Sequence, residues 1–146
     1  MKLGLFGGSF DPVHLGHLLV AQAACEEFGL DRLCFIPAAQ SPFKPGSSPA
    51  PAKARVQMLH LALAGRAQYE VDGQEITRGG VSYTMETVRN YRRRLPQARI
   101  FWLIGADHVA KLPLWRDAEE LAAAVEFLVI PRPGEPAVPF PSPFRG

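Results

Sequence analysis

The sequence has few of the features that mark a secreted or membrane-bound protein. It contains only two cysteines, Cys25 and Cys34, which do not form a C-x-x-C pair and lie among apolar residues. A disulfide framework is therefore not expected, and a reducing compartment is favoured. The first eleven residues carry one Lys followed by glycines, Ser and Asp, unlike a signal peptide. Apolar runs stay well below the roughly 20 residues that a membrane span requires, so we expect a cytoplasmic protein without a membrane partner.

The sequence also has little excess charge of either sign. The net charge is +2 over 146 residues, whereas nucleic-acid-binding domains usually show a concentrated basic stripe. The one compact basic run, Arg92-Arg93-Arg94, falls at the end of an expected helix. Cations there complement the helix dipole and stay solvated. We therefore expect no nucleic-acid partner.

Strand and helix patterns alternate along the chain. Short apolar runs predict strands over 2–6, 32–37, 69–72, 99–105 and 126–131, and helical spacing predicts helices over 14–28, 52–64 and 84–95. Asp117 with Glu120 has the spacing of a capping box and predicts a further helix through Ala124. Continuous apolar strands that alternate with helices are typical of a parallel sheet covered on both faces. We predict a single α/β domain with a Rossmann-like, doubly wound parallel sheet.

The first predicted helix has an apolar stripe. Leu15, Leu18, Leu19 and Ala23 recur there at helical spacing.

The C-terminal segment is rich in proline. Six of the sixteen residues from Pro131 to Gly146 are proline, which excludes helix and central strand. We therefore expect a domain over residues 1–134, followed over residues 135–146 by a Pro-rich tail that is loop, extended linker or disordered.

The stretches rich in polar and glycine residues each follow a predicted strand. They cover residues 7–17, 38–45, 105–108 and 131–134. Because the carboxyl ends of parallel strands meet at one edge of the sheet, and ligands bind there where the strand order reverses, these stretches should converge on one site.

The first of them, GGSFDPVHLGH (7–17), is suited to phosphate. Glycines let a ligand approach the backbone, and the helix start beyond offers N–H groups and a positive dipole end. His14 and His17 are three apart and share a helix face, and Gly16 removes a side chain between them and leaves room for a nucleotide. The stretch lacks the full P-loop and dinucleotide-binding glycine patterns. Two other interpretations stay open: a metal site with Asp11, or a plain helix cap with two surface histidines.

The same stretch resembles the signature of the H-x-G-H nucleotidyltransferases and, more narrowly, of bacterial nicotinate-nucleotide adenylyltransferases. Further stretches that match this family in order are SPFK (41–44), RVQM (55–58), SYT (82–84), GAD (105–107) with Trp115, and RPG (132–134). The first motif alone would fit several transferases, but the set is specific. The resemblance covers residues 1–134 and implies a nucleotidyltransferase domain of the HUP type.

The resemblance implies transfer of AMP from ATP to nicotinate mononucleotide, which gives nicotinate adenine dinucleotide and pyrophosphate on the route to NAD. His14, His17 and Lys44 would act on the ATP phosphates, and Mg²⁺ would enter with the nucleotide. Substrate contacts are implied for Gly7, Gly8, Ser9, Phe10, Thr84, Gly105, Asp107, Trp115 and Arg132. Within this set, the backbone of residues 7–10 would lie near the phosphates, Trp115 would stack on the pyridine ring, and Thr84 would contact the carboxylate. Gly105 and Asp107 would contact the adenosine.

The residues alone also allow plainer roles. Trp115 fits a core position, Thr84 a helix N-cap, and Asp107 a cap of the short helix after the fourth strand. Arg55 fits a tether of the 38–51 loop, and His108 follows Asp107 without an assigned role.

One motif of the family is not found in the sequence. The family carries I-S-S-T-x-I-R near its C-terminus, and the resemblance therefore predicts an incomplete ATP half of the site here. Three alternatives remain: a nicotinamide mononucleotide adenylyltransferase, a pantetheine-phosphate adenylyltransferase, and a catalytically impaired nucleotide-binding module. The sequence leaves the oligomeric state open, with a homo-oligomer as one option.

Overall fold

The computed structural model describes residues 1–39, 50–131, 137 and 139–146. Its strands form one sheet in the order β3-β2-β1-β4-β5, and each neighbouring pair is parallel. The strands are β1 (Lys2–Gly8), β2 (Arg32–Pro37), β3 (Tyr69–Val71), β4 (Arg99–Gly105) and β5 (Glu126–Ile130). The predicted α/β class and the parallel sheet are therefore confirmed, and so is a strand at each of the five predicted places.

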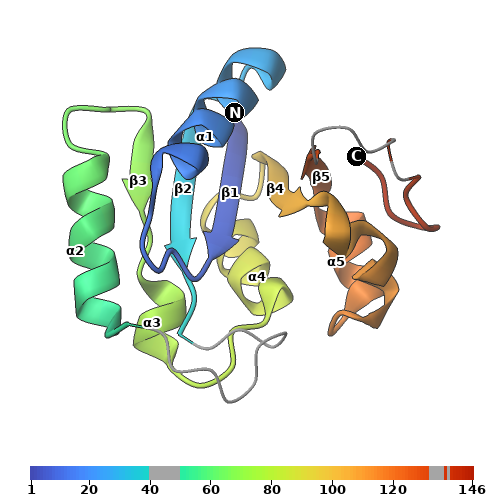
Figure 1. Cartoon of the computed structure of the whole chain (residues 1–146). Helices are drawn as coiled ribbons and strands as arrows, with labels where there is room; N and C mark the ends of the chain where they lie inside the picture. Colours follow the sequence, from blue (N-terminus) through green and yellow to red (C-terminus); the bar gives the residue numbers. More distant parts are fainter. Residues whose placement is uncertain (40–49, 132–136, 138) are drawn as a thin grey trace.

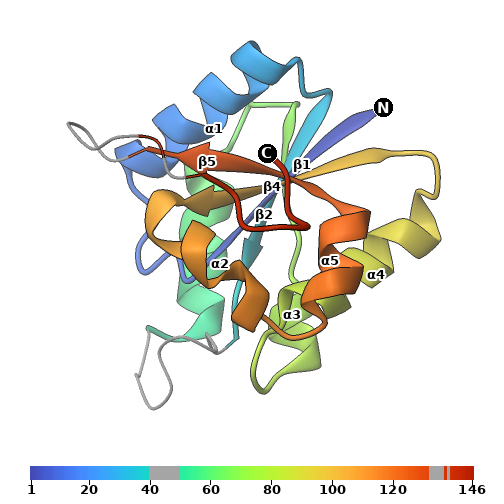
Figure 2. The ribbon, with the colours of Figure 1, turned by 90° about the vertical axis from the view of Figure 1, so that its right-hand side faces the viewer.

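Helices cover both faces of this sheet. They are α1 (Leu15–Phe28), α2 (Ala52–Ala62), α3 (Gln74–Arg78), α4 (Thr84–Arg94) and α5 (Ala118–Ala124), with a 3₁₀ helix η1 (Ala106–Leu114) after β4. Helices α1 and α2 lie on one face, and α4 and α5 lie on the other (Figure 1, and edge-on in Figure 2). Buried β4 side chains alternate between the two cores: Trp102 packs on the α4 side, and Phe101 and Leu103 pack on the α1 side.

The strand order reverses between β1 and β4. From β1 the chain proceeds outward through β2 to β3, and it then returns to place β4 and β5 on the other side of β1. A Cβ on Gly7 would lie 2.6 Å from Cζ2 of Trp102, so a glycine at the end of β1 lets this ring from β4 pack against the strand. The carboxyl ends of β1 and β4 are where a ligand site is expected in a sheet of this kind.

The buried face of α1 differs from the predicted stripe. Ala21, Ala24 and Cys25 are buried, whereas the side chains of Leu15 and Leu19 are 68% and 56% exposed. The strands below α1 contribute large rings, including those of Phe6, Phe35 and Phe101. Small helix side chains therefore fill the remaining space. Of the four predicted positions, Leu18 is partly buried and packs against this core, whereas Leu15, Leu19 and Ala23 are exposed.

The predicted capping box at α5 is also wrong. Asp117 precedes the helix with a φ of 55° and makes no side-chain cap bond. Instead, Nη2 of Arg89 on α4 contacts Oδ2 of Asp117 at 2.9 Å and also pairs with the carboxylate of Glu120. The two acids thus connect α5 to α4.

The two cysteines, Cys25 and Cys34, are both free and buried, as the sequence indicated. No helix in the described ranges is both long and apolar enough to cross a membrane.

The described residues of the Pro-rich tail contain neither helix nor strand, as predicted. They pack on the core nonetheless. The rings of Phe140 and Phe144 lie 6.4 and 5.8 Å from that of Phe127 on β5, and N of Phe127 donates to O of Arg145 at 3.0 Å. The boundary predicted at residue 134 remains a proposal.

Candidate active site

Two histidines cap the start of α1. Nδ1 of His14, the N-cap residue, accepts a hydrogen bond from N of Gly16 at 3.1 Å. In return, Nδ1 of His17 accepts one from N of His14, also at 3.1 Å. This is a capping box in which imidazoles replace the usual hydroxyl and carboxylate. The interpretation of the two histidines as a helix cap is therefore confirmed. Capping uses only Nδ1 of each ring and leaves Nε2 for another role.

The capping bonds determine where the protons of both rings lie. Because each Nδ1 accepts from the backbone, the proton of each neutral ring is on Nε2. The rings are stacked, with centroids 3.9 Å apart. Burial, and then the nearby His14, lower the pKa of His17 below its ordinary value, so this ring is neutral at neutral pH. The helix start therefore has two oriented N–H donors in addition to its own backbone donors.

Gly16 makes room for His14, which sharpens its predicted role. A Cβ at this position would lie 2.9 Å from Cε1 of His14. We expect Gly16→Ala to displace the ring and lower kcat about tenfold, by loss of a preorganised donor. The free energy of unfolding should change little, because the helix preference for Ala, worth about 1 kcal/mol, offsets the lost cap.

Steady-state kinetics and urea unfolding measure these two effects. Gly73→Ala is the matched control, since a Cβ there meets nothing within 4 Å. A Gly16→Ala protein with the kcat of the wild type would show that the ring position of His14 has no bearing on the reaction.

A cavity of about 230 Å³ lies at the carboxyl ends of β1 and β4. Of the predicted site residues, it is lined by Gly7, Gly8, Ser9, Thr84, Gly105 and Trp115. The stretches after β1 and β4 and before α4 therefore converge on this edge. His14 and His17 stand at the helix start that follows Gly8 and Ser9 and are not among the lining residues. Lys44 and Arg132 lie outside the described residues.

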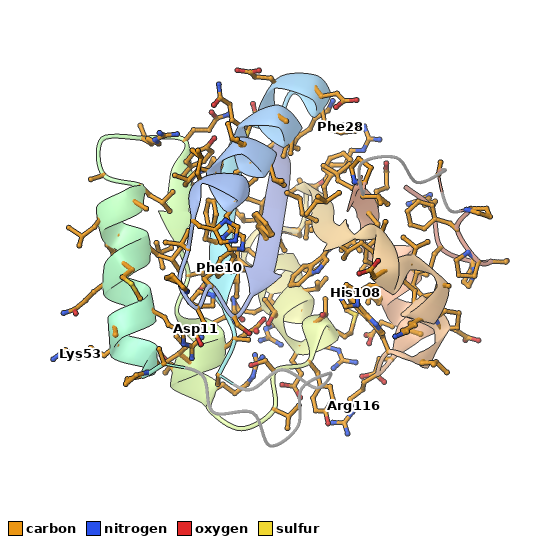
Figure 3. The ribbon with its side chains drawn as sticks, viewed as in Figure 1. Phe10, Asp11, Phe28, Lys53, His108 and Arg116 are labelled. Atoms are coloured by element: carbon orange, nitrogen blue, oxygen red, sulfur yellow. The ribbon has the colours of Figure 1, made fainter. Side chains whose placement is uncertain are left out.

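Phe10 and Asp107 are not among the residues that line the cavity. The Phe10 side chain is 3% exposed, and its ring packs against those of Phe6, His17 and Phe35 at 5.3, 5.0 and 5.5 Å. Phe10, labelled in Figure 3, thus contacts the imidazole of His17 from the core. Asp107 is exposed in the first turn of η1 and does not line the cavity. Their predicted substrate contacts remain predictions.

Thr84 and Trp115 lie in the cavity wall. Thr84 is the first residue of α4, whose N-cap is Tyr83, so the interpretation of Thr84 as an N-cap is wrong. The ring of Trp115 packs edge-on against Phe127 at 6.3 Å while also lining the cavity, so core packing and ligand contact are compatible. His108, left without a role from sequence, lines the same wall, and its ring lies 6.4 Å from that of Trp115. Figure 3 shows His108 on η1.

Arg55 connects the segments that surround the first loop, as the sequence suggested. The residue is 2% exposed, and its guanidinium donates to three carbonyl oxygens. Nη1 reaches O of Ser9 and O of Ala38, both at 2.8 Å, and Nε reaches O of Ala50 at 2.9 Å. Arg55 therefore holds the loop after β1 against the two described ends that flank residues 40–49.

Glu75 and Ser82 were missed by the sequence reasoning. Both are buried and line the cavity, and burial raises the pKa of Glu75 above its ordinary value. Glu75 belongs to α3, which has only five residues and so shows no helical periodicity in the sequence. Ser82 is the first residue of the SYT stretch, in which only Thr84 was assigned a contact.

The fold and the site define a nucleotidyltransferase: a parallel sheet with a cavity at its switch point, beside a helix start suited to phosphate. The chain matches the family model described as cytidylyltransferase-like over residues 5–144. A probable nicotinate-nucleotide adenylyltransferase of Opitutus terrae is 46% identical over 136 residues, which cover 93% of this chain and 70% of that protein. A protein of the same description from Thermus thermophilus is 43% identical over 143 residues, which cover 98% of this chain and 76% of the relative.

A solved structure shares the fold. The nicotinic acid mononucleotide adenylyltransferase of Plasmodium falciparum complexed with NaAD superposes with a TM-score of 0.78 at 16% identity, over 91% of this chain and 65% of that chain. The chain therefore belongs to the nicotinate-nucleotide adenylyltransferase family, which confirms the resemblance of its motifs.

Proposed function

We propose that the protein transfers AMP from ATP to nicotinate mononucleotide, giving nicotinate adenine dinucleotide and pyrophosphate for the synthesis of NAD. The observation that carries this proposal is the placement of the paired histidines. They cap α1 five residues along the chain from Ser9, which lines the cavity, and Trp115 lies in the wall of the same cavity. The proposed site combines these donors, for phosphate, with this aromatic ring, for a base.

The reaction needs no general base on the protein. The nucleophile is a phosphate monoester, whose second pKa is about 6, so it is largely ionised at neutral pH. Its oxygen attacks the α-phosphorus of ATP, and the bond from that phosphorus to the β-phosphate bridging oxygen breaks. Catalysis then rests on positioning two anionic substrates and stabilising charge on the α-phosphate.

The chain supplies this stabilisation through N–H donors. Nε2 of His17 is proposed to donate to the α-phosphate in the transition state, and Nε2 of His14 to a neighbouring phosphate oxygen. Both donors are held in direction by their capping bonds, so little reorganisation is needed when charge develops. Lys44 is proposed as a further cation on the phosphates.

Mg²⁺ is proposed to enter with ATP. Within the part of the chain that the structure describes, no group of three or more His, Cys, Asp or Glu side chains is placed to hold a metal ion. Oδ2 of Asp11 instead accepts from N of Ala50 at 3.1 Å. These residues fit an ion held by phosphate oxygens and water, which would neutralise charge on the triphosphate.

The acceptor is proposed to lie on the side of Thr84 and Trp115. Trp115 would stack on the pyridine ring, and Thr84 with the first N–H groups of α4 would bind the nicotinate carboxylate. Gly105, Asp107 and Arg132 are proposed to contact the nucleotide. Charged nucleotide substrates fit the cytoplasmic location expected from the sequence. That location stays a prediction.

Trp115→Ala should weaken the mononucleotide selectively. Loss of the stacked ring is expected to raise KM for nicotinate mononucleotide about tenfold or more, since base–aromatic stacking contributes about 1–3 kcal/mol. KM for ATP should change less than twofold, and Trp115→Phe should recover part of the loss. An equal rise in both KM values would identify Trp115 as a core residue only.

An acceptor panel tests the proposed function. Purified protein is incubated with ATP, Mg²⁺ and either nicotinate mononucleotide, nicotinamide mononucleotide or phosphopantetheine, and released pyrophosphate is measured. The proposal predicts the highest kcat/KM with nicotinate mononucleotide. A preference for either other acceptor would identify the corresponding transferase, and ATP binding without pyrophosphate release would indicate a nucleotide-binding module.

A further inference from the structure

Glu75 is a carboxylate in the cavity wall that the proposed reaction does not use. It lies on α3, is 4% exposed, and lines the same cavity as Thr84 and Trp115. Burying a carboxylate is costly unless hydrogen bonds satisfy it. Its partners therefore indicate what the residue does.

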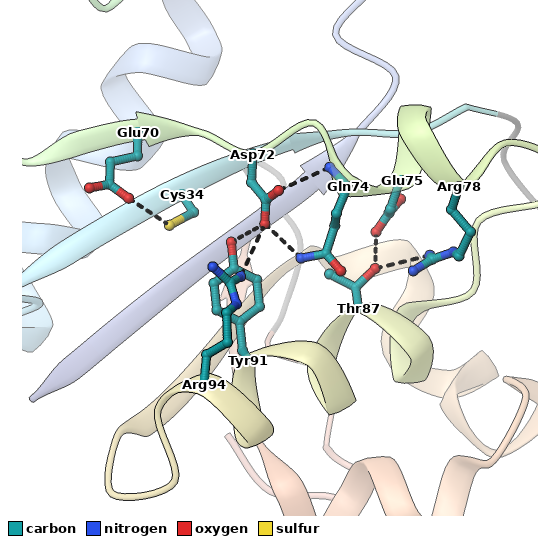
Figure 4. A network of polar contacts seen from close by, with 9 residues as sticks. All are labelled: Cys34, Glu70, Asp72, Gln74, Glu75, Arg78, Thr87, Tyr91 and Arg94. Atoms are coloured by element: carbon teal, nitrogen blue, oxygen red, sulfur yellow. Dashed lines mark hydrogen bonds and ion pairs between the residues drawn. The ribbon is translucent and has the colours of Figure 1, made fainter.

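Glu75 is bound by a hydroxyl group of α4. Oγ1 of Thr87, in the first turn of α4, donates to Oε2 of Glu75 at 2.5 Å and accepts from Nη2 of Arg78 on α3 at 3.3 Å (Figure 4). Ser82 is buried in the same cavity wall, and its side chain lowers the pKa of Glu75 against the larger effect of burial. Oγ of Ser82 accepts from N of Ala39 at 3.1 Å.

These contacts lie on both sides of Thr84. Ser82 is two residues before Thr84 and is bound by N of Ala39, and Thr87 is three residues after it and is bound to Glu75. Thr84 itself begins α4, so the same bonds set the direction of the first N–H groups of that helix. Ala39 extends the connection to the segment that follows β2.

We propose that Glu75 is a positioning residue for the acceptor: it holds Ser82 and Thr87 so that Thr84 and the first turn of α4 face the ligand. The inference rests on the proposed function, because it assigns Thr84 to the nicotinate carboxylate. It goes beyond that function by making the affinity for the acceptor depend on a residue that does not touch the reacting atoms.

Glu75→Gln tests the proposal. The side chain keeps its size, but its amide group adds N–H donors where the Thr87 hydroxyl donates. The variant should still fold, because α3 has a second attachment: Asp72 accepts from N of Gln74 at 2.9 Å and from the hydroxyl of Tyr91 on α4 (Figure 4). We expect the Kd for nicotinate mononucleotide to rise about tenfold, which corresponds to the loss of one or two hydrogen bonds.

The Kd for ATP and kcat at saturating substrates should each change less than twofold. Calorimetric titration with each substrate measures both Kd values without requiring turnover. Glu120→Gln is the matched control. The carboxylate of Glu120 pairs with Nη2 of Arg89, so it joins α5 to α4, and neither residue lines the cavity. This variant should leave both Kd values unchanged.

Thr87→Val provides a second variant that removes the donor and leaves Glu75 in place. It should weaken nicotinate mononucleotide in the same direction. An unchanged acceptor Kd in either cavity variant, or equal weakening of both substrates, would overturn the inference. Wild-type protein that binds nicotinate mononucleotide but forms no dinucleotide would contradict the proposed function alone, whereas failure to bind it at all would overturn both.

Discussion

Replacing His17 with Ala is expected to lower kcat by about 10²-fold or more, the usual cost of removing one preorganised donor from a developing charge. The KM for ATP should change far less, because the bond to the α-phosphate strengthens only in the transition state. The variant also loses the acceptor for N of His14, so we expect the free energy of unfolding to fall by about 1 kcal/mol.

Two further variants separate the effect of His17 on kcat from its effect on the free energy of unfolding. His17→Gln places a good capping-box acceptor at the same helix position without the imidazole, and it should recover stability but not kcat. His60→Ala removes an exposed histidine from α2 and should change neither quantity. Steady-state kinetics with urea unfolding distinguishes these cases, and wild-type kcat in His17→Ala would remove the residue from the mechanism.

Replacing Arg55 with Met should have the largest effect on stability. Met fills part of the space but leaves the carbonyl oxygens of Ser9, Ala38 and Ala50 without their donor. Buried acceptors without partners cost about 1–3 kcal/mol each, and partial rehydration reduces the sum, so the free energy of unfolding should fall by about 3 kcal/mol.

Activity should fall with it, because Ser9 lines the cavity and belongs to the loop that leads to the paired histidines. Lys53→Met is the matched control, since it removes an exposed cation from the same helix. Arg55→Lys should recover little, because an ammonium group cannot reproduce the planar fork that reaches three oxygens. Urea unfolding measures all three variants, and a loss below 1 kcal/mol for Arg55→Met would show that the clamp adds little to the fold.

The sheet was predictable because its strands are buried on both faces. Residues 32–37 and 99–105 are continuous apolar runs, and each became a strand with the predicted ends. The histidine pair was predictable for a similar reason, since a three-residue spacing at a helix start puts both rings on one face. Gly29 adopts the left-handed conformation that ends α1, as a glycine at that place predicts.

The remaining features depend on contacts that a linear pattern does not contain. The buried face of α1 was decided by the large rings of the strands beneath it, which favoured alanines over Leu15 and Leu19. Asp117 pairs with Arg89, a residue 28 positions earlier, instead of making the expected cap bond. Glu75 gave no signal because the helix that carries it is a single short turn in a polar stretch.

The most direct test of the central claim follows the phosphorus atoms of ATP. Protein, Mg²⁺ and nicotinate mononucleotide are incubated with ATP labelled at the α- or γ-phosphate, and the products are separated. Attack at the α-phosphorus predicts that the α label appears in nicotinate adenine dinucleotide and the γ label in pyrophosphate, with both signals reduced about 10²-fold in His17→Ala. Transfer of the γ label to the mononucleotide, or release of the α label as ADP, would contradict the account.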